Sequence, residues 1–265
     1  MLKQRTITAA IGIPAIIAVI WFGDPWFSLF IAAVVLAGTF EFYRMALNPR
    51  QPLIYLGLLW SLALALSPHY IDILPLIMAA AVVASLICLL CCSPQGKAFH
   101  NWAWIVAGVI YVGWMLSYWI NLHALEDGRS WVYLAVFTTF ANDTGAFFVG
   151  RTWGKHKLAS AISPGKTWEG ALGGLLSANV GAIIIFLILG HFSSLPLGYW
   201  QVILLACFVS FFAQFGDLVE SLCKRNIGIK EAGKLLPGHG GVLDRFDSLI
   251  FVGAMVYYYV IWMVV

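Results

Sequence analysis

Residues 167–190 read TWEGALGGLLSANVGAIIIFLILG and contain a single charged side chain, that of Glu169. As a helix, this stretch is long enough to cross a hydrocarbon core about 30 Å thick. Inside lipid every backbone N–H and C=O needs a partner within the protein, and a helix supplies these partners within one segment. The stretch therefore predicts a transmembrane helix.

The rest of the chain has the same character. Of its 265 residues, 62% are hydrophobic and 10% are charged, whereas soluble domains carry about 25% charged residues. No linker, low-complexity tract or repeat of fixed period divides the sequence. We expect an all-α polytopic integral membrane protein with a single membrane domain, 1–265. Residues 1–130 are expected to be scaffold and lipid-facing helices, and residues 131–265 form a second half that contains the longest polar segments.

Apolar runs separated by Pro, Gly or polar breaks predict about nine transmembrane helices. The run 53–67 is short, which favours a tilted or partly re-entrant segment. The first run resembles a signal peptide, but no small-x-small cleavage site precedes Asp24, so it predicts an uncleaved span. The expected spans lie near 7–22, 26–47, 53–67, 73–92, 102–122, 131–149, 167–190, 198–218 and 246–264.

The basic residues indicate the orientation of these spans. With the N-terminus in the cytoplasm, only Arg129 of the 15 lysines and arginines falls in an outer loop. This distribution follows the positive-inside rule. Nine spans then place the C-terminus outside.

The five cysteines argue against a disulfide framework, because their number is odd and four of them lie in apolar segments. Cys88, Cys91 and Cys92 could bind a metal, but no second Cys or His pair nearby completes a zinc site. We expect packed or lipid-facing thiols.

Eight acidic residues lie on or near the inner side of the membrane, and the positive-inside rule, which concerns lysine and arginine, does not account for them. A carboxylate at membrane depth costs about 2.5–3.5 kcal/mol, so it needs a partner or a function. Glu41 beside Arg44 predicts a structural ion pair, and Glu220 with Lys224 an ordinary i, i+4 pair. The inner acids are Glu41, Asp143, Glu169, Asp217, Glu220, Glu231, Asp244 and Asp247.

The polar segment 216–247 combines three kinds of group. Asp217, Ser221 and Lys224 share one helix face with Glu220. A glycine-rich loop follows and opens onto the helix that begins near Asp244, so its N–H groups can approach an anion. Taken singly, the loop could be only a tight connection between helices, and the lysines and arginines could be only the basic residues that the positive-inside rule requires. Together they suit a nucleotide phosphate chain held through Mg²⁺, which prefers a few carboxylates and substrate phosphates.

A long signature ends this segment: Ser221, Lys224-Arg225, Lys230, Gly233, Pro237, His239-Gly240-Gly241, Asp244-Arg245 and Asp247. With Asp143-Thr-Gly-Ala146 and the stretch 154–168, it resembles the phosphatidate cytidylyltransferase (CDP-diglyceride synthase) family, in particular the bacterial enzymes. The resemblance is strong over about 140–250, and the N-terminal half matches only in length and hydropathy. One departure is Glu231, where the family usually has Asp.

The resemblance implies transfer of CMP from CTP to phosphatidate, giving CDP-diacylglycerol and pyrophosphate. It implies a bacterial cytoplasmic (inner) membrane and a catalytic half, 131–265, whose active site is a polar cavity facing the cytoplasm. It also implies Mg²⁺, with room for a second, monovalent cation such as K⁺. Its partners are CTP, phosphatidate and membrane lipid, with no nucleic acid. A homodimer is also implied, and Gly170, Gly173, Gly174 and Gly181 would let helices pack closely.

Residue roles follow from the resemblance as expectations. Asp217 and Asp244 are expected to hold the metal, with Asp247 as a further ligand. The expected phosphate contacts are Lys224, Arg225, Lys230 and Arg245. The same pocket is expected to contain Asp143, Lys166, Ser221, His239, Gly240 and Gly241.

Two rival interpretations remain open. A related CTP-dependent transferase acting on another lipid phosphate would need the same residue chemistry. An ion-coupled membrane transporter would also place acids at membrane depth, but it would be expected to distribute charges near the midplane and on both sides of it.

Overall fold

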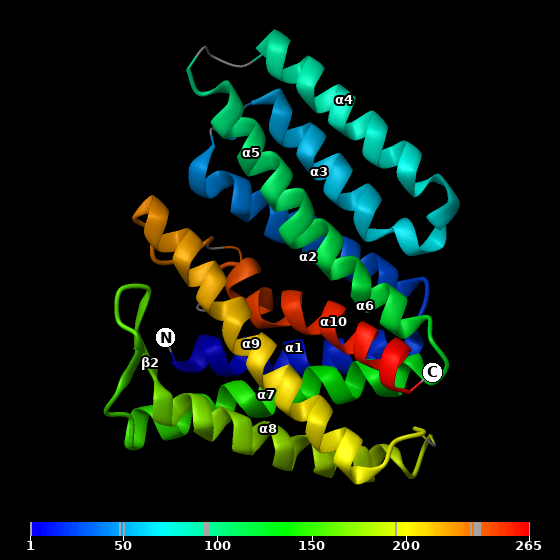
Figure 1. Cartoon of the computed structure of the whole chain (residues 1–265), viewed down its shortest axis with the longest axis vertical. Coiled ribbons are helices and arrows are strands. Elements are labelled where there is room, and N and C mark those ends of the chain that lie inside the picture. Colours follow the sequence, from blue (N-terminus) through cyan, green and yellow to red (C-terminus); the bar gives the residue numbers. More distant parts are fainter. Residues whose placement is uncertain are drawn as a thin grey trace. The chain divides into compact units, whose positions relative to one another are not determined.

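The computed structural model describes residues 2–47, 49, 51–92, 96–193, 195–233, 235 and 240–264. Helices dominate this part of the chain (Figure 1). A π-helical segment, Val109–Trp114, joins α5 to α6, and the 3-10 turns Ser67–His69 and Ile71–Ile73 precede α4. The helices are α1 (Leu2–Phe22), α2 (Trp26–Ala46), α3 (Pro52–Ala65), α4 (Leu74–Cys92), α5 (Ala98–Gly108), α6 (Met115–His123), α7 (Gly128–Thr152), α8 (Trp168–Leu189), α9 (Tyr199–Ile227) and α10 (Leu243–Met263).

Seven helical segments of the described residues are long and apolar enough to cross a membrane. Two shorter apolar helices, Gly12–Phe22 and Pro52–Ala65, accompany them. The prediction of an all-α polytopic membrane protein is therefore confirmed. The count of nine spans and the sides of the two termini stay predictions. The seven segments are Trp26–Ala46, Ile71–Cys91, Ala98–His123, Gly128–Trp153, Trp168–Leu189, Tyr199–Ile227 and Leu243–Met263.

The chain divides into two compact units, and both are discontinuous in sequence. The first unit comprises Met1–Asn121 and Glu231–Arg245, and the second comprises Leu122–Lys230 and Phe246–Val265. Helix α10 therefore begins in the first unit and continues in the second. The predicted single domain and its subdivision at residue 130 stay predictions.

Tyr43 of α2 lies at the centre of the first unit. Its side chain is fully buried, and its hydroxyl donates a hydrogen bond of 2.9 Å to the carbonyl oxygen of Ile105 in α5. A Cβ atom at Gly57 of α3 would lie 2.7 Å from the Tyr43 hydroxyl oxygen, closer than real side chains approach. Glycine at this position lets α3 reach the Tyr43 ring.

In the second unit α7 and α8 lie side by side (Figure 1). A Cβ at Gly181 would lie 2.6 Å from the Cβ of Ala141, and a Cβ at Gly173 would collide with Val149. The glycines of α8 therefore serve packing within one chain, which removes them as support for a homodimer. The other side of α8 exposes a broad apolar surface suited to lipid: Leu172, Leu176, Val180, Ile184 and Leu187.

A short antiparallel hairpin, which the sequence did not lead us to expect, precedes α8. Its strands are β1 (Lys157–Ala159) and β2 (Ser163–Thr167). The Thr167 side chain caps α8 by accepting the N–H of Gly170 at 3.1 Å. Glu169 accepts the backbone N–H of His156 at 3.2 Å, and its carboxylate lies 2.5 Å from Nδ1 of the same histidine. The first turn of α8 thus fixes both ends of the hairpin.

Candidate active site

Asp217 of α9 faces a lysine from the hairpin. The Nζ atom of Lys166 lies 2.8 Å from Oδ2 of Asp217, and the Asp217 side chain is 39% exposed. Ser221, one turn later, donates from its hydroxyl to Oδ1 of Asp217 at 3.3 Å. The contact with Lys166 shows that this carboxylate has room for a cation.

Glu220 and Lys224 form an ion pair on the same helix, as the spacing predicted. The side chain of Glu220 is 1% exposed and that of Lys224 is 11% exposed. Buried charges of this kind are stable only when they are paired. In this structure the ammonium of Lys224 is therefore held by Glu220.

Asp247 of α10 lies close to α9. The backbone there is tightly packed, because a Cβ at Gly216 would collide with the carbonyl oxygen of Asp247. Asp143, Asp217 and Glu220 lie within electrostatic range of the Asp247 carboxylate. This cluster combines four carboxyl groups with two lysines, Lys166 and Lys224.

A buried amide network supports Asp143. Asn142 is fully buried, and its Nδ2 donates to Oδ1 of Asp143 at 3.0 Å. Its Oδ1 accepts from the Ser210 hydroxyl at 2.6 Å. Gln214 donates to the carbonyl oxygen of Ala171 at 3.2 Å and to Ser210 Oγ at 3.1 Å. The network joins α7, α8 and α9 directly behind the Asp143 carboxylate.

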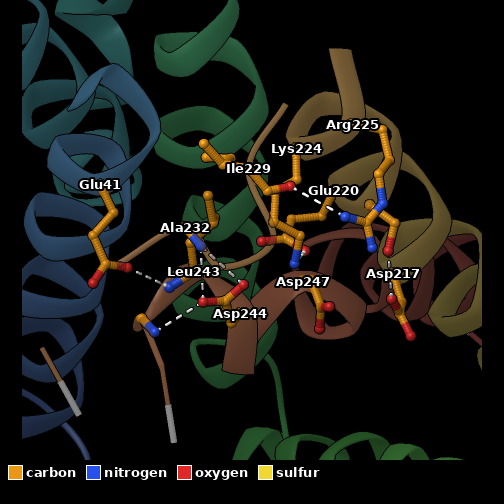
Figure 2. Close-up of polar contacts among 12 residues, drawn as sticks. Glu41, Asp217, Glu220, Lys224, Arg225, Ile229, Ala232, Leu243, Asp244 and Asp247 are labelled. Atoms are coloured by element: carbon orange, nitrogen blue, oxygen red, sulfur yellow. Dashed lines mark hydrogen bonds and ion pairs between the residues drawn. The ribbon is translucent and has the colours of Figure 1, made fainter. Parts of the chain in front are cut away.

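Arg225 ties the hairpin to the end of α9. Its Nε donates to the carbonyl oxygen of Ile162 at 3.1 Å. A terminal nitrogen donates to the carbonyl oxygen of Ile229 at 3.3 Å (Figure 2). Ile162 stands between the two strands. The guanidinium therefore fixes the turn that precedes the strand of Lys166.

Asp244 closes a loop in the first unit. Its carboxylate accepts the N–H of Ala232 at 3.0 Å and that of Gly241 at 2.8 Å (Figure 2). Gly240 has a positive φ of 82°, which favours glycine there. Asp244 thus holds both flanks of the loop that separates α9 from α10.

Glu41 contacts the same region from α2. Its Oε2 accepts the N–H of Leu243 at 2.9 Å, and the residue is 6% exposed (Figure 2). The predicted ion pair with Arg44 is wrong: the described residues form no such pair, and the Arg44 guanidinium lies 5.5 Å from the centre of the Phe40 ring. The N–H of Leu243, the first residue of α10, binds Oε2 of the buried carboxylate instead, whereas Oε1 has no hydrogen-bond partner among the described residues.

Asp217 and Asp247 supply carboxylate oxygens, the type of donor that Mg²⁺ prefers. Among the described residues, no group of three or more His, Cys, Asp and Glu side chains is arranged to hold a metal. Mg²⁺ usually takes one or two carboxylates and completes its shell with water and phosphate oxygens. Asp217, already paired with a cation, and Asp247 supply oxygen donors of this kind.

A sequence model of the cytidylyltransferase family matches residues 3–263. This chain belongs to the cytidylyltransferase family. The match runs through both compact units, so membership rests on almost the whole chain and not on the C-terminal signature alone.

Three curated relatives of this family member are named phosphatidate cytidylyltransferase. The phosphatidate cytidylyltransferase of Bacillus subtilis (strain 168) is 34% identical, with 97% of both chains covered. That of Staphylococcus epidermidis (strain ATCC 35984) is 34% identical over 95% of this chain and 96% of the relative. That of Synechocystis sp. (strain ATCC 27184) is 33% identical over 98% and 97%. The transporter alternative finds no support in these matches.

The structure of this family member brings some predicted site residues together. Lys166, Ser221 and Asp217 are in contact, with Asp143 and Asp247 within electrostatic range. Asp244, Arg245, Gly240 and Gly241 belong to the first unit and Lys230 to the second, whereas His239 lies outside the described residues. Asp217 and Asp244 fall in different units, so their predicted meeting stays a prediction, as do the assigned roles.

Sequence reasoning missed three contributors. Glu41 was assigned to Arg44, Asn142 was not singled out, and the turn at Ile162 was not recognised as a partner of Arg225. A signal existed for the first two. An acid and an amide in otherwise apolar helices need polar partners, and Asn142 directly precedes a predicted site residue.

Proposed function

We propose that this family member transfers CMP from CTP to phosphatidate and produces CDP-diacylglycerol and pyrophosphate. The observation that carries the proposal is the identity of about one third to phosphatidate cytidylyltransferases over at least 95% of both chains. The cluster around Asp217 supports it, because carboxylates and lysines side by side suit a reaction between two polyanions.

The reaction needs charge control more than a base. A phosphate monoester has a second pKa of about 6, so phosphatidate is largely a dianion at pH 7. One of its oxygens forms a bond to the α-phosphorus of CTP, and the bond from that phosphorus to the β-phosphate bridging oxygen breaks. Pyrophosphate leaves with that electron pair. Cations must screen the repulsion and hold the two groups in line.

The chain's own cations are proposed to do this. Lys166 is half of an ion pair and only 21% exposed, so it can exchange its carboxylate partner for a phosphate oxygen without travelling far. Lys230 and Arg245 are exposed and are proposed as further phosphate contacts. Lys224 and Arg225 are held by Glu220 and by backbone carbonyls, and we propose that they add positive charge from those fixed positions.

Asp217, Asp244 and Asp247 are proposed to hold Mg²⁺, with space for a monovalent cation such as K⁺. When bound, the metal would neutralise phosphate charge and orient the nucleotide. The excess of carboxylates over lysines around Asp247 supports this assignment. His239, Gly240 and Gly241 are proposed to shape the nucleotide site.

The site is proposed to face the cytoplasm from a bacterial inner membrane, as the distribution of basic residues favours. Thiol labelling of intact cells and inverted vesicles tests this. A cysteine at position 234 should react only from the cytoplasmic side and one at position 127 only from outside. The opposite pattern would invert the topology. A homodimer is proposed from the family resemblance alone.

The decisive assay uses purified protein, radiolabelled CTP and phosphatidate in detergent micelles. We expect label to enter the lipid fraction with Mg²⁺, to stop when EDTA is added, and to resume when Mg²⁺ is restored. Parallel reactions with other lipid phosphates and with dCTP measure selectivity. Faster labelling of another lipid phosphate would favour the related transferase, and the absence of labelled lipid would remove the proposal.

A further inference from the structure

The carboxylate of Glu41 lies so close to two glycines of the loop before α10 that neither position could carry a side chain. A Cβ at Gly241 would lie 2.5 Å from Oε2 of Glu41, and a Cβ at Gly233 would collide with Oε1 and Cδ of the same side chain. Real Cβ atoms essentially never lie closer than 3.0 Å to another heavy atom. The loop therefore closes on Glu41 at both of its flanks.

Glu41 also caps the helix that this loop enters. The first N–H groups of a helix have no partner within the helix, and negative charge near them is favourable. Here the N–H of Leu243 donates to Glu41, and the N–H of Gly241 donates to Asp244 (Figure 2). Glu41 thus binds the first N–H of α10, and Asp244 binds an N–H two residues before the helix begins.

The two carboxylates differ in what they connect. The backbone donors to Asp244 that belong to Ala232 and Gly241 lie within 12 residues of it. Glu41 lies 202 residues from Leu243 and belongs to α2, whose neighbouring side chains Phe42 and Tyr43 are buried in the first unit. Among the described contacts, Asp244 binds the backbone on both flanks of the loop, and Glu41 connects the loop to α2.

We infer that Glu41 is a positioning residue for the reaction: it fixes the backbone around Gly233, Gly241 and Leu243, so that Asp244 and the groups beside it keep one orientation toward the substrate phosphates. The inference rests on the proposed function for its catalytic part. The anchoring itself rests on geometry within the first unit.

Substitution of Glu41 tests the positioning role by activity. Glu41→Ala should lower kcat by about 10- to 100-fold, the usual cost of removing a group that orients a ligating side chain. Glu41→Gln should retain more activity, because its Oε1 can still accept the N–H of Leu243. Glu126→Gln, an exposed acid in the second unit, is the matched control and should behave as wild type. A purely structural role would lower the yield of folded protein and leave the kcat of the folded fraction unchanged.

A double-mutant cycle tests the steric claim. Gly233→Ala alone should reduce kcat, because its new methyl group collides with Glu41. All three of the nearest atoms to that Cβ belong to Glu41. The pair Glu41→Ala with Gly233→Ala should therefore be no worse than Glu41→Ala alone. Effects that simply multiply would overturn the anchoring.

Limited trypsin digestion supplies a readout that needs no activity. Cleavage after Lys230, which is exposed at the edge of the loop, should be several-fold faster in Glu41→Ala than in wild type or Glu126→Gln. The positioning role alone would be overturned by three results together: the wild type is active, Glu41→Ala is cleaved at the wild-type rate, and the effects of Glu41→Ala and Gly233→Ala on kcat multiply. A wild type that makes no labelled lipid would overturn it together with the proposed function, whatever the cleavage rate.

Discussion

Asp217 and Asp244 were predicted to do the same work, yet they have different kinds of partner. Asp217 is paired with the side-chain ammonium of Lys166 and is 39% exposed. Asp244 accepts backbone N–H groups of Ala232 and Gly241. A side-chain cation on a partly exposed carboxylate can be replaced by another cation, whereas backbone hydrogen bonds are lost only when the loop rearranges.

The difference shows that an aspartate in this region can contribute to the chemistry, to the stability of the fold, or to both. At Asp217 the charge is available for chemistry and contributes little to stability, because partly exposed ion pairs are worth about 0–1 kcal/mol. At Asp244 the charge also maintains the loop. Substitutions that remove only the charge should therefore affect the two positions differently.

The largest effect is expected at Asp217. Asp217→Asn should lower the initial rate of labelled lipid formation by about 1,000-fold, because a fixed charge that organises the phosphates is lost. The midpoint of thermal unfolding should shift by no more than a degree or two. Asp127→Asn, the same substitution at an exposed loop position, is the control. A rate within a few-fold of wild type would remove Asp217 from the site.

Asp244→Asn should combine a smaller kinetic effect with a loss of stability. The amide keeps one acceptor oxygen but turns an NH₂ group toward backbone donors, so we expect about 1–3 kcal/mol of destabilisation and a rate about 100-fold lower. Parallel denaturant and rate measurements check both. If stability were unchanged, the backbone contacts of Asp244 would be dispensable and its role would match that of Asp217.

The smallest effect is expected at Arg225. Arg225→Lys keeps the positive charge but loses the planar fork that reaches the carbonyls of Ile162 and Ile229. We expect about 1 kcal/mol of destabilisation and faster trypsin cleavage at Lys157 in the hairpin. Comparison with Arg225→Gln separates charge from geometry. If Arg225→Lys is active and Arg225→Gln is inactive, the positive charge matters more than the hydrogen bonds to Ile162 and Ile229.

Much of the architecture could be predicted, because lipid imposes a simple rule. Long apolar runs must be helical, and the runs near 26–47 and 246–264 became α2 and α10 with small changes at their ends. The hairpin was not predicted, because its strands are only three and five residues long and are held by contacts of Thr167, Glu169 and Arg225. No alternating hydrophobic pattern marks such strands.

Residue spacing alone predicts contacts in the site only where the residues are close in sequence, whereas the family resemblance also placed Lys166 and Asp143 in the pocket of Asp217. The spacing of Glu220 and Lys224 reveals their pair directly. The partner of Glu41 is 202 residues away, and Arg44 one turn later offered a plausible local alternative. A long-range contact between an acid and a backbone N–H cannot be predicted from residue spacing. The glycines at 233 and 241 are consistent with this contact, because a Cβ at either position would collide with Glu41.

The glycines of α8 have a consequence at some distance from the phosphates. They bring α8 against α7, the helix that carries Asn142 and Asp143, and the side chains of Val149 and Asn142 occupy the space that a Cβ at Gly173 or Gly174 would need. An added methyl group on this seam would push α7 outward and move the Asp143 carboxylate with it. A residue in the hydrocarbon layer can thus alter the polar chemistry while touching neither substrate nor solvent.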